Sequence, residues 1–181
     1  HAEQTIDAAG LEIYPGFVDA HSHIGLDGYG EPGVDINERN DICCPQLRAI
    51  DGVNPMDESF VYARSAGITC VCTGPGSANV LGGTFTAIKT AGTRIDDMIV
   101  KKEAAMKCAF GENPKRCYAS KCDSSRMTTA AILREALMKA RLYLQKKEAA
   151  GDDVFRQPAF DMKLEALIPV LRGQIPLKAH A

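Results

Sequence analysis

The chain has 181 residues, of which 45% are hydrophobic and 24% are charged, and its formal net charge is −2. This is the composition of a globular protein with one sizeable core, and it excludes a disordered or collagen-like chain. Because 21 basic residues balance 23 acidic ones, we expect no nucleic-acid partner. No apolar run is long enough to cross a membrane, and no signal-peptide pattern is present, so we expect neither a membrane partner nor secretion.

Seven cysteines form an odd set without the regular spacing of a secreted disulfide scaffold. Cys117 and Cys122 have a spacing compatible with zinc, but no second pair of cysteines or histidines accompanies them. Reduced thiols in a cytoplasmic protein are therefore the favoured interpretation, with a structural zinc as the weaker alternative.

Short strands alternate with helices along most of the chain. In order, we expect strand-like pieces at 5–7 and 11–14, a buried strand at 17–24, a long loop at 25–55, a helix at 57–66, strands at 68–73, 82–88 and 106–110, helices at 128–150 and 162–171, and a strand at 175–181. This alternation is typical of an α/β fold with a parallel sheet. A loop as long as the one after the first buried strand is usually functional.

The motif His21-Ser22-His23 lies near the end of that first buried strand. Side chains at i and i+2 of a strand point to the same face, so two imidazoles can share one metal ion. Asp19 lies on the same face and is a candidate to orient one histidine through its free ring N–H. The alternative is a pair of histidines hydrogen-bonded to carbonyls and water at a strand end.

The segment Tyr14-Pro15-Gly16-Phe17-Val18-Asp19-Ala20-His21-Ser22-His23 resembles the first-strand motif of the metal-dependent amidohydrolase superfamily, and most closely its imidazolonepropionase-like branch. Further matching segments follow in order along the chain. They are Asp7–Gly10, Thr73–Asn79, Gly111–Arg116 and Pro176–Ala181.

The resemblance implies an α/β fold, a partial (β/α)8 TIM barrel with its metal centre at the C-terminal strand ends. Residues 16–181 would be the N-terminal half of the barrel, and residues 1–15 a remnant of a small β-sandwich. The implied activity is hydrolysis of an amide or lactam C–N bond in a small-molecule substrate by a metal-activated water.

The resemblance also implies a ligand set for one or two divalent ions, with zinc as the first choice. His21 and His23 would hold one ion, and His180 would be a ligand of a second ion. Glu112 is the candidate bridging group, against the alternative of a helix-capping or solvated glutamate. Lys107 and Lys178 are weaker candidates for a carbamylated lysine in that position.

The family's general acid/base, an aspartate on the last barrel strand, has no counterpart among these residues. We therefore expect an incomplete, inactive fragment whose exposed barrel edges favour a homo-oligomer or a domain-swapped dimer. The alternative from another class is a non-catalytic metal-binding module or scaffold. A nucleotide-binding domain is disfavoured, because neither a P-loop nor a dinucleotide-binding glycine motif is present.

Overall fold

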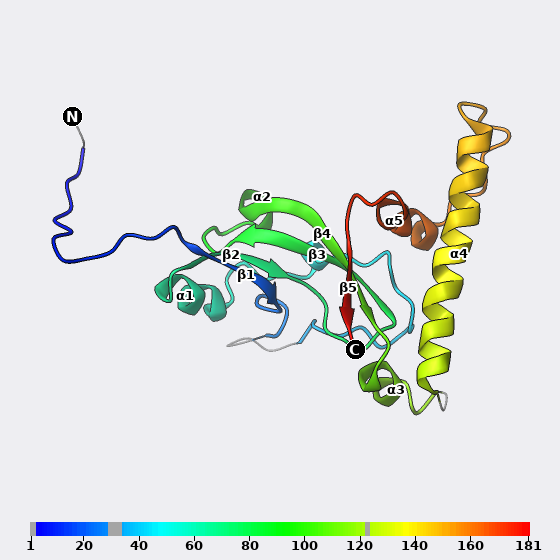
Figure 1. Cartoon of the computed structure of the whole chain (residues 1–181), viewed down its shortest axis with the longest axis horizontal. Helices are drawn as coiled ribbons and strands as arrows, with labels where there is room; N and C mark the ends of the chain where they lie inside the picture. The colour runs from blue at the N-terminus through cyan, green and yellow to red at the C-terminus, as the bar shows by residue number, and fades with distance from the viewer. Residues whose placement is uncertain (1–2, 29–33, 122–123) are drawn as a thin grey trace.

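The computed structural model of the chain describes residues 3–28, 34–121 and 124–181 (Figure 1). The strands are β1 (Phe17–Ser22), β2 (Ile68–Thr73), β3 (Leu81–Lys89), β4 (Ile99–Ala109) and β5 (Leu177–His180). The helices are α1 (Glu58–Ser65), α2 (Ile95–Met98), α3 (Glu112–Cys117), α4 (Arg126–Ala150) and α5 (Met162–Leu171), with a 3-10 turn, η1, at Ala49–Asp51.

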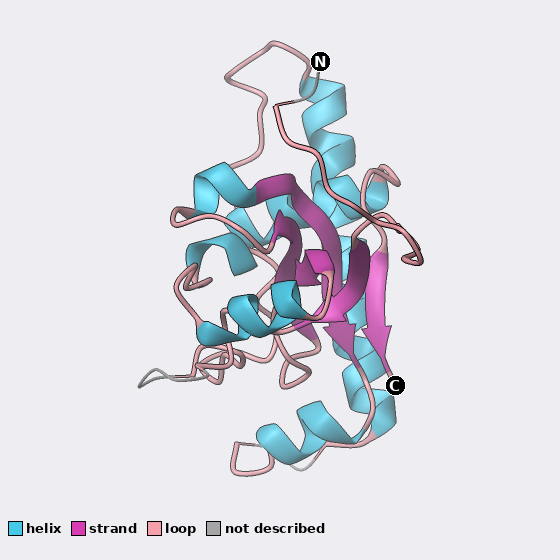
Figure 2. Cartoon of the chain, turned by 90° about the vertical axis from the view of Figure 1, so that its left-hand side faces the viewer, coloured by secondary structure: helices cyan, strands magenta, loops and turns pink. Residues whose placement is uncertain are grey.

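The five strands form one curled sheet in the order β1-β2-β3-β4-β5 (Figure 2). The pairs β1–β2 and β4–β5 are parallel, as expected. The pairs β2–β3 and β3–β4 are antiparallel, so the expectation of a wholly parallel sheet is wrong. Only residues 74–80 separate β2 from β3, which is too short for the crossover that a parallel pair requires. The curled sheet with helices outside it confirms an α/β fold and a partial barrel.

Two apolar clusters fix the helices on the sheet. One cluster brings Phe60 of α1 onto Val71 of β2 and Ile88 of β3. The other brings Ala140 of α4 and Leu167 of α5 onto the sheet. Its other buried residues are Leu81, Met106, Cys108 and Ile175. In Figure 1, α4 and α5 therefore lie together beside β4 and β5, with α1 at the other end of the sheet.

The longer helices begin at residues that satisfy free backbone N–H groups. The side chain of Asp57 accepts a hydrogen bond from the backbone N–H of Ser59 at the start of α1, at 2.8 Å. Ser125 forms a capping box with Thr128 at the start of α4. Among the described residues, no helix is both long enough and apolar enough to span a membrane.

Residues 3–16 form no strand, so the strand-like pieces expected at 5–7 and 11–14 are wrong. They lie extended away from the sheet in Figure 1, and without a hydrogen-bonding neighbour an extended segment is not a strand. A β-sandwich remnant over residues 1–15 is not seen in the described part of this segment.

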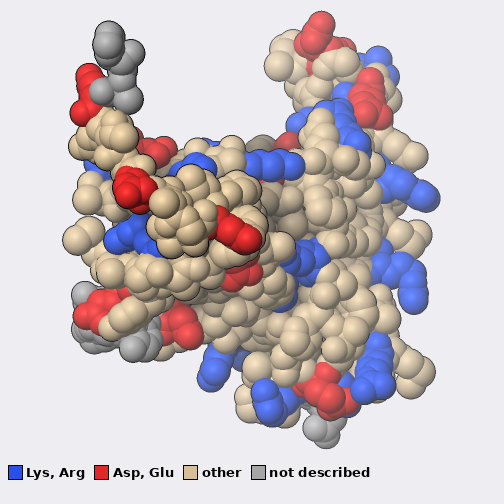
Figure 3. All heavy atoms as spheres, turned by 60° about the vertical axis from the view of Figure 1, so that its left-hand side comes forward, with Lys and Arg blue, Asp and Glu red and all other residues tan. Residues whose placement is uncertain are grey.

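The helix α4 is rich in basic side chains, and Figure 3 shows basic side chains along the right-hand side of the molecule, where this helix lies. Its basic residues are Arg126, Arg134, Lys139, Arg141, Lys146 and Lys147, against the acidic Glu135 and Glu148. Lys147 pairs with Glu165 of α5, whereas the other five basic residues are exposed to solvent.

Candidate metal centre

The imidazoles of His21, in β1, and His23, which directly follows β1, lie side by side. The ring centroids of His21 and His23 are 5.2 Å apart and the ring planes are nearly perpendicular. The alternation of side chains along a strand brings them to the same face, as the sequence predicts.

A backbone carbonyl orients the ring of His23. Its Nδ1 lies 2.7 Å from the carbonyl oxygen of Gly74, at the end of β2. Because a carbonyl only accepts hydrogen bonds, Nδ1 is the protonated donor, and Nε2 keeps its lone pair for a ligand. This is the arrangement that histidine ligands of metals commonly have.

Asp19 acts on the backbone of His21. Its Oδ1 accepts a hydrogen bond from the backbone N–H of His21 at 3.0 Å. The sequence suggests that Asp19 orients an imidazole. The carbonyl of Gly74 takes this role instead, and the imidazole that it orients is that of His23.

Two lysines of neighbouring strands lie close to these rings. Lys107 of β4 and Lys178 of β5 are directly paired in the parallel ladder. Lys107 is fully buried, and its Nζ has no hydrogen-bond partner among the described residues. Burial and the neighbouring Lys178 lower the pKa of Lys107. Burial, followed by the charges of Lys107 and Lys178, also lowers the pKa of His21, which favours the neutral imidazole that binds metals.

Lys178 spans the curl of the sheet. Its Nζ donates a hydrogen bond to the carbonyl oxygen of Ala20 on β1, so β5 is linked through a side chain to the first strand. The histidines and both lysines are therefore within the same part of the molecule, although Lys178 and Ala20 are 158 positions apart in the chain.

Glu112 and His180 line a different cavity, of about 430 Å³. The side chain of Glu112 is 67% exposed and pairs with Lys115 and Arg126. The Nε2 of His180 lies 3.3 Å from the side-chain nitrogen of Asn113. Across the described ranges, no three His, Cys, Asp or Glu side chains are grouped closely enough to hold a metal ion. The structure thus brings His21 and His23 together but does not gather the predicted four-residue ligand set.

The glycine-rich segment after β2 forms a turn. The N–H of Gly74 donates to the carbonyl of Ser22 at 3.3 Å, and that of Gly76 donates to the carbonyl of Ile36 at 2.6 Å. Both amides are therefore occupied by protein carbonyls and do not form an anion cradle. Cys117 is a free thiol, and its predicted partner Cys122 lies outside the described residues.

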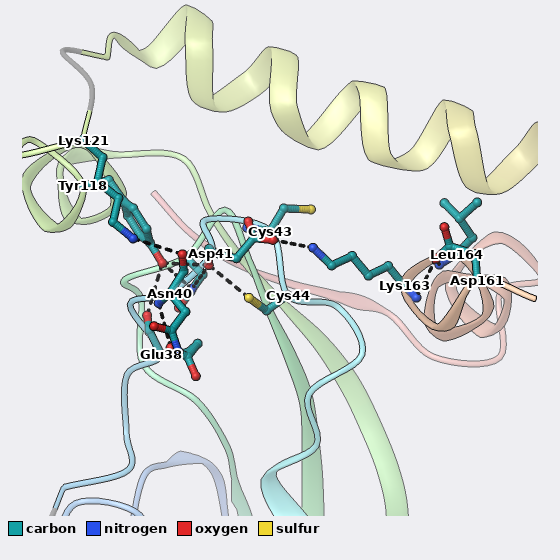
Figure 4. Close-up of polar contacts among 11 residues, drawn as sticks. Glu38, Asn40, Asp41, Cys43, Cys44, Tyr118, Lys121, Asp161, Lys163 and Leu164 are labelled. Atoms are coloured by element: carbon teal, nitrogen blue, oxygen red, sulfur yellow. Dashed lines mark hydrogen bonds and ion pairs between the residues drawn. The ribbon is translucent and has the colours of Figure 1, made fainter.

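The long loop after β1 is held in place at Asp41 (Figure 4). The backbone carbonyl of Asp41 accepts hydrogen bonds from the Tyr118 hydroxyl at 2.7 Å and the Asn79 side chain at 2.8 Å. Its carboxylate pairs with Lys163 of α5. Burial, followed by nearby negative charges, raises the pKa of Tyr118 to about 12, so its hydroxyl remains a donor.

The thiol beside this anchor is protonated. The Sγ of Cys44 donates to the same Asp41 carbonyl at 3.0 Å, and burial raises the pKa of Cys44 to about 11. A protonated thiol is a poor metal ligand and a poor nucleophile. This fits the interpretation of the cysteines as reduced structural residues.

Comparisons with known proteins agree on one family. The chain is similar to the amidohydrolase tasK of Hapsidospora irregularis, with 33% identity over 199 residues. It is also similar to the crystal structure of an amidohydrolase from Thermotoga maritima MSB8, with 40% identity and a TM-score of 0.87 over the whole of this chain. The chain belongs to the amidohydrolase family.

The match leaves much of each amidohydrolase relative uncovered. It includes 96% of this chain but 20% of tasK, and 50% of the Thermotoga protein. No protein-family model matches this amidohydrolase chain. The chain therefore spans no more than half the length of these relatives.

Two contributors to the site were not predicted from the sequence. One is the carbonyl of Gly74, and the other is Phe85 of β3, whose ring centroid lies 5.3 Å from that of His21. A carbonyl has no residue-type signature, so the first gives no signal. In the sequence, Phe85 is one of several apolar residues in a predicted strand. It reaches the histidines because β3 pairs antiparallel with β2 and β4.

Proposed function

We propose that this chain supplies the first half of a metal-dependent hydrolase site that cleaves a C–N bond of an amide or lactam in a small-molecule substrate. The observation that carries the proposal is the His21–His23 pair, in which the Gly74 carbonyl fixes the tautomer of His23 and leaves Nε2 available. The relationship to the amidohydrolases supports the reaction class.

The donor set fits a divalent ion such as zinc when a further ligand is added to the two imidazoles. The orphaned amine of Lys107 favours that residue over the exposed and already paired Glu112. A neutral Lys107 amine that combines with carbon dioxide forms an N–C bond, releases a proton and gains two oxygens. We propose this carbamate as the additional ligand, and retain His180 as a candidate for a second ion.

When bound, the ion supplies a water of lowered pKa and polarises the substrate carbonyl. The residues of this chain hold and orient the site. Gly74 fixes the ring of His23, Asp19 fixes the backbone at His21, and Lys178 ties β5 to β1. We assign no residue of this chain to protonation of the leaving nitrogen, so we propose that these 181 residues alone bind the ion without turnover.

A metal titration of the full chain tests the proposal. We expect one tightly bound Co²⁺ or Zn²⁺ and loss of tight binding in His21→Ala and in His23→Ala, because each variant removes an imidazole ligand. Cobalt distinguishes this site from the cysteines, since cobalt thiolates give intense charge-transfer bands that imidazole and oxygen ligands lack. Calorimetry gives the affinity and the absorption spectrum gives the ligand type.

Three variants complete the design. Lys107→Met keeps an unbranched buried side chain but removes the amine, and we expect weaker binding in bicarbonate buffer. His180→Ala tests the remaining member of the predicted set, and Cys117→Ser is the control that should leave binding unchanged. Equal metal stoichiometry and affinity in wild type, His21→Ala and His23→Ala would defeat the assignment. Binding without amide hydrolysis by a full-length protein that contains this segment would favour the non-catalytic module.

A further inference from the structure

The ring of Phe85 lies close to both histidines and both lysines of the candidate site. Phe85 is fully buried on β3. Its ring centroid lies 5.3 Å from the ring of His21 and 6.1 Å from that of His23. The Nζ atoms of Lys107 and Lys178 lie 5.5 Å and 4.9 Å from the same centroid.

These four neighbours come from three strands on either side of β3. His21 belongs to β1 and His23 directly follows it, while Lys107 belongs to β4 and Lys178 to β5. Because the sheet order places β3 in the middle of the curl, its buried Phe85 side chain reaches β1 on one side and β4 and β5 on the other, and β1 is not a ladder neighbour of either β4 or β5. Phe85 therefore occupies a position from which one side chain can set the spacing of the others.

The two lysine side chains explain why an aromatic ring is favoured there in the metal-free chain, before Lys107 forms the proposed carbamate. Lys107 and Lys178 are paired across β4 and β5, and no acidic side chain forms an ion pair with either in the described structure. Lys107 has no hydrogen-bond acceptor at all among these residues. The face of an aromatic ring carries partial negative charge and attracts a desolvated cation, whereas an aliphatic side chain of the same volume offers no such attraction.

The ring of Phe85 also packs against the backbone of Gly74, the residue that orients His23. A Cβ added to Gly74 would lie 2.3 Å from the Phe85 ring, so the ring packs directly on the main chain at that position. The carbonyl of the same glycine accepts the Nδ1 hydrogen bond of His23. A displacement of the ring is thus transmitted to the residue that fixes the imidazole.

We propose that Phe85 is a positioning residue of the metal centre, which sets the orientation of the two histidines and holds both lysine side chains beside them. This inference rests on the proposed function, because it assigns Phe85 to the site that His21 and His23 are proposed to form. It does not make Phe85 a ligand or a catalytic residue.

Two substitutions separate the aromatic face from simple filling of space. Phe85→Met keeps an unbranched apolar side chain that fills the core but removes the π face. Phe85→Tyr keeps the ring. Phe60→Met is the matched control, since Phe60 is also buried but belongs to the cluster under α1. All three are made in the full chain, and unfolding midpoints are measured alongside Co²⁺ affinity by calorimetry.

We expect Phe85→Met to weaken Co²⁺ binding by about 10-fold or more, as is common for loss of a group that orients metal ligands. Phe85→Tyr should remain within about threefold of wild type, and Phe60→Met should lose folding stability while keeping its affinity. Wild-type affinity in Phe85→Met would overturn the proposal. Equal weakening in Phe60→Met would overturn it as well, because the effect would then be general loss of stability.

A second measurement needs neither metal nor a stable variant. In the metal-free wild-type chain, NMR should show the ε-methylene protons of Lys107 and Lys178 shifted upfield by the ring current of Phe85. Unshifted lysine signals would overturn the inference, whatever the variants do. If wild type binds no metal but these shifts are present, the proposed function fails while the arrangement around Phe85 stands, so the two failures are distinguishable.

Discussion

Asp41 shows how a single residue can join three distant parts of the chain. Its backbone carbonyl receives the hydroxyl of Tyr118, and its carboxylate pairs with Lys163 of α5. Burial raises the pKa of Asp41, but hydrogen bonds from Lys163 and from the backbone N–H of Cys43 outweigh it, so the net pKa is lowered. The hydrogen bond that Lys163 donates to Asp41, set against a smaller effect of burial, raises the pKa of Lys163.

These directions predict a pH window for the ion pair. A carboxyl group with a lowered pKa stabilises the fold above its unfolded value of about 3.9, and this contribution is lost as the pH falls through the folded value. A lysine with a raised pKa stabilises the fold below about 10.4, and this is lost above it. Because both side chains are partly exposed, we expect at most about 1 kcal/mol from the pair.

Asp41→Asn is the sharp test, because its amide oxygen can still accept from the N–H of Cys43 while the charge is gone. Urea unfolding should show the variant less stable than wild type at pH 7, with the difference shrinking as the pH falls below about 4 and through the lowered folded pKa. Lys163→Gln should show the same difference at pH 7. A constant difference at all pH values would mean that the ion pair does not stabilise the fold.

At the scale of elements, the contact between the long loop and β3 depends on Gly83. Its φ is +103°, and a Cβ there would lie 2.4 Å from the carbonyl oxygen of Leu47. Gly151, which follows α4, also has a positive φ of 56° but has no atom within 4 Å of a built Cβ. A substitution at Gly151 therefore tests backbone strain alone, whereas one at Gly83 tests strain together with a steric clash against Leu47.

We predict that Gly151→Ala costs about 1 kcal/mol, which is the conformational penalty alone. Gly83→Ala should cost more than about 2 kcal/mol, because the loop must also move away from β3. Denaturant unfolding of both variants measures the difference. Equal costs would show that the loop yields without penalty.

Local sequence signals predicted some elements well and others not at all. The helices α4 and α5 and the strand β2 follow from apolar spacing and capping residues, which are properties of neighbouring positions. The direction of β3 does not, since it is decided by the few residues that link it to β2. The sequence was ambiguous before the strand expected at 106–110, whereas β4 begins at Ile99 and is likewise stabilised by its long antiparallel pairing with β3.

The candidate site divides in the same way. His21 and His23 are found from the sequence because their spacing alone places them together. Glu112 and His180 were predicted beside them from the family resemblance, and the structure places these two around another cavity. The resemblance named Lys107 only as a weaker candidate and did not name Phe85. Their burial and their contact come from strands that fold together, which no local pattern reveals.

The whole molecule presents β1 and β5 as the outer strands of the sheet. On β1, Phe17 and Val18 are 63% and 68% exposed. An outer strand with exposed apolar side chains favours pairing with another chain. We therefore expect the 181-residue chain to self-associate through this strand, as the sequence predicted for exposed barrel edges.

Val18→Lys should shift the chain towards monomer, because a charged side chain on an outer strand opposes edge-to-edge pairing. Val61→Lys is the control, since Val61 is also exposed but belongs to α1. Sedimentation velocity over a range of concentrations measures the outcome. A monomeric wild type, or an equal response to both substitutions, would contradict the prediction.

The hydrogen bond from Lys178 to Ala20 has a consequence for the order of folding. It joins residues 158 positions apart, whereas the β3–β4 hairpin pairs residues that are close in sequence, such as Ile88 and Ile99. Contacts between distant residues carry a larger loop-closure entropy and form later. We expect the hairpin to nucleate first and the approach of β5 to β1 to be the last event. A metal ion that binds only after this closure would slow reopening, so its dissociation rate would report on the whole curl.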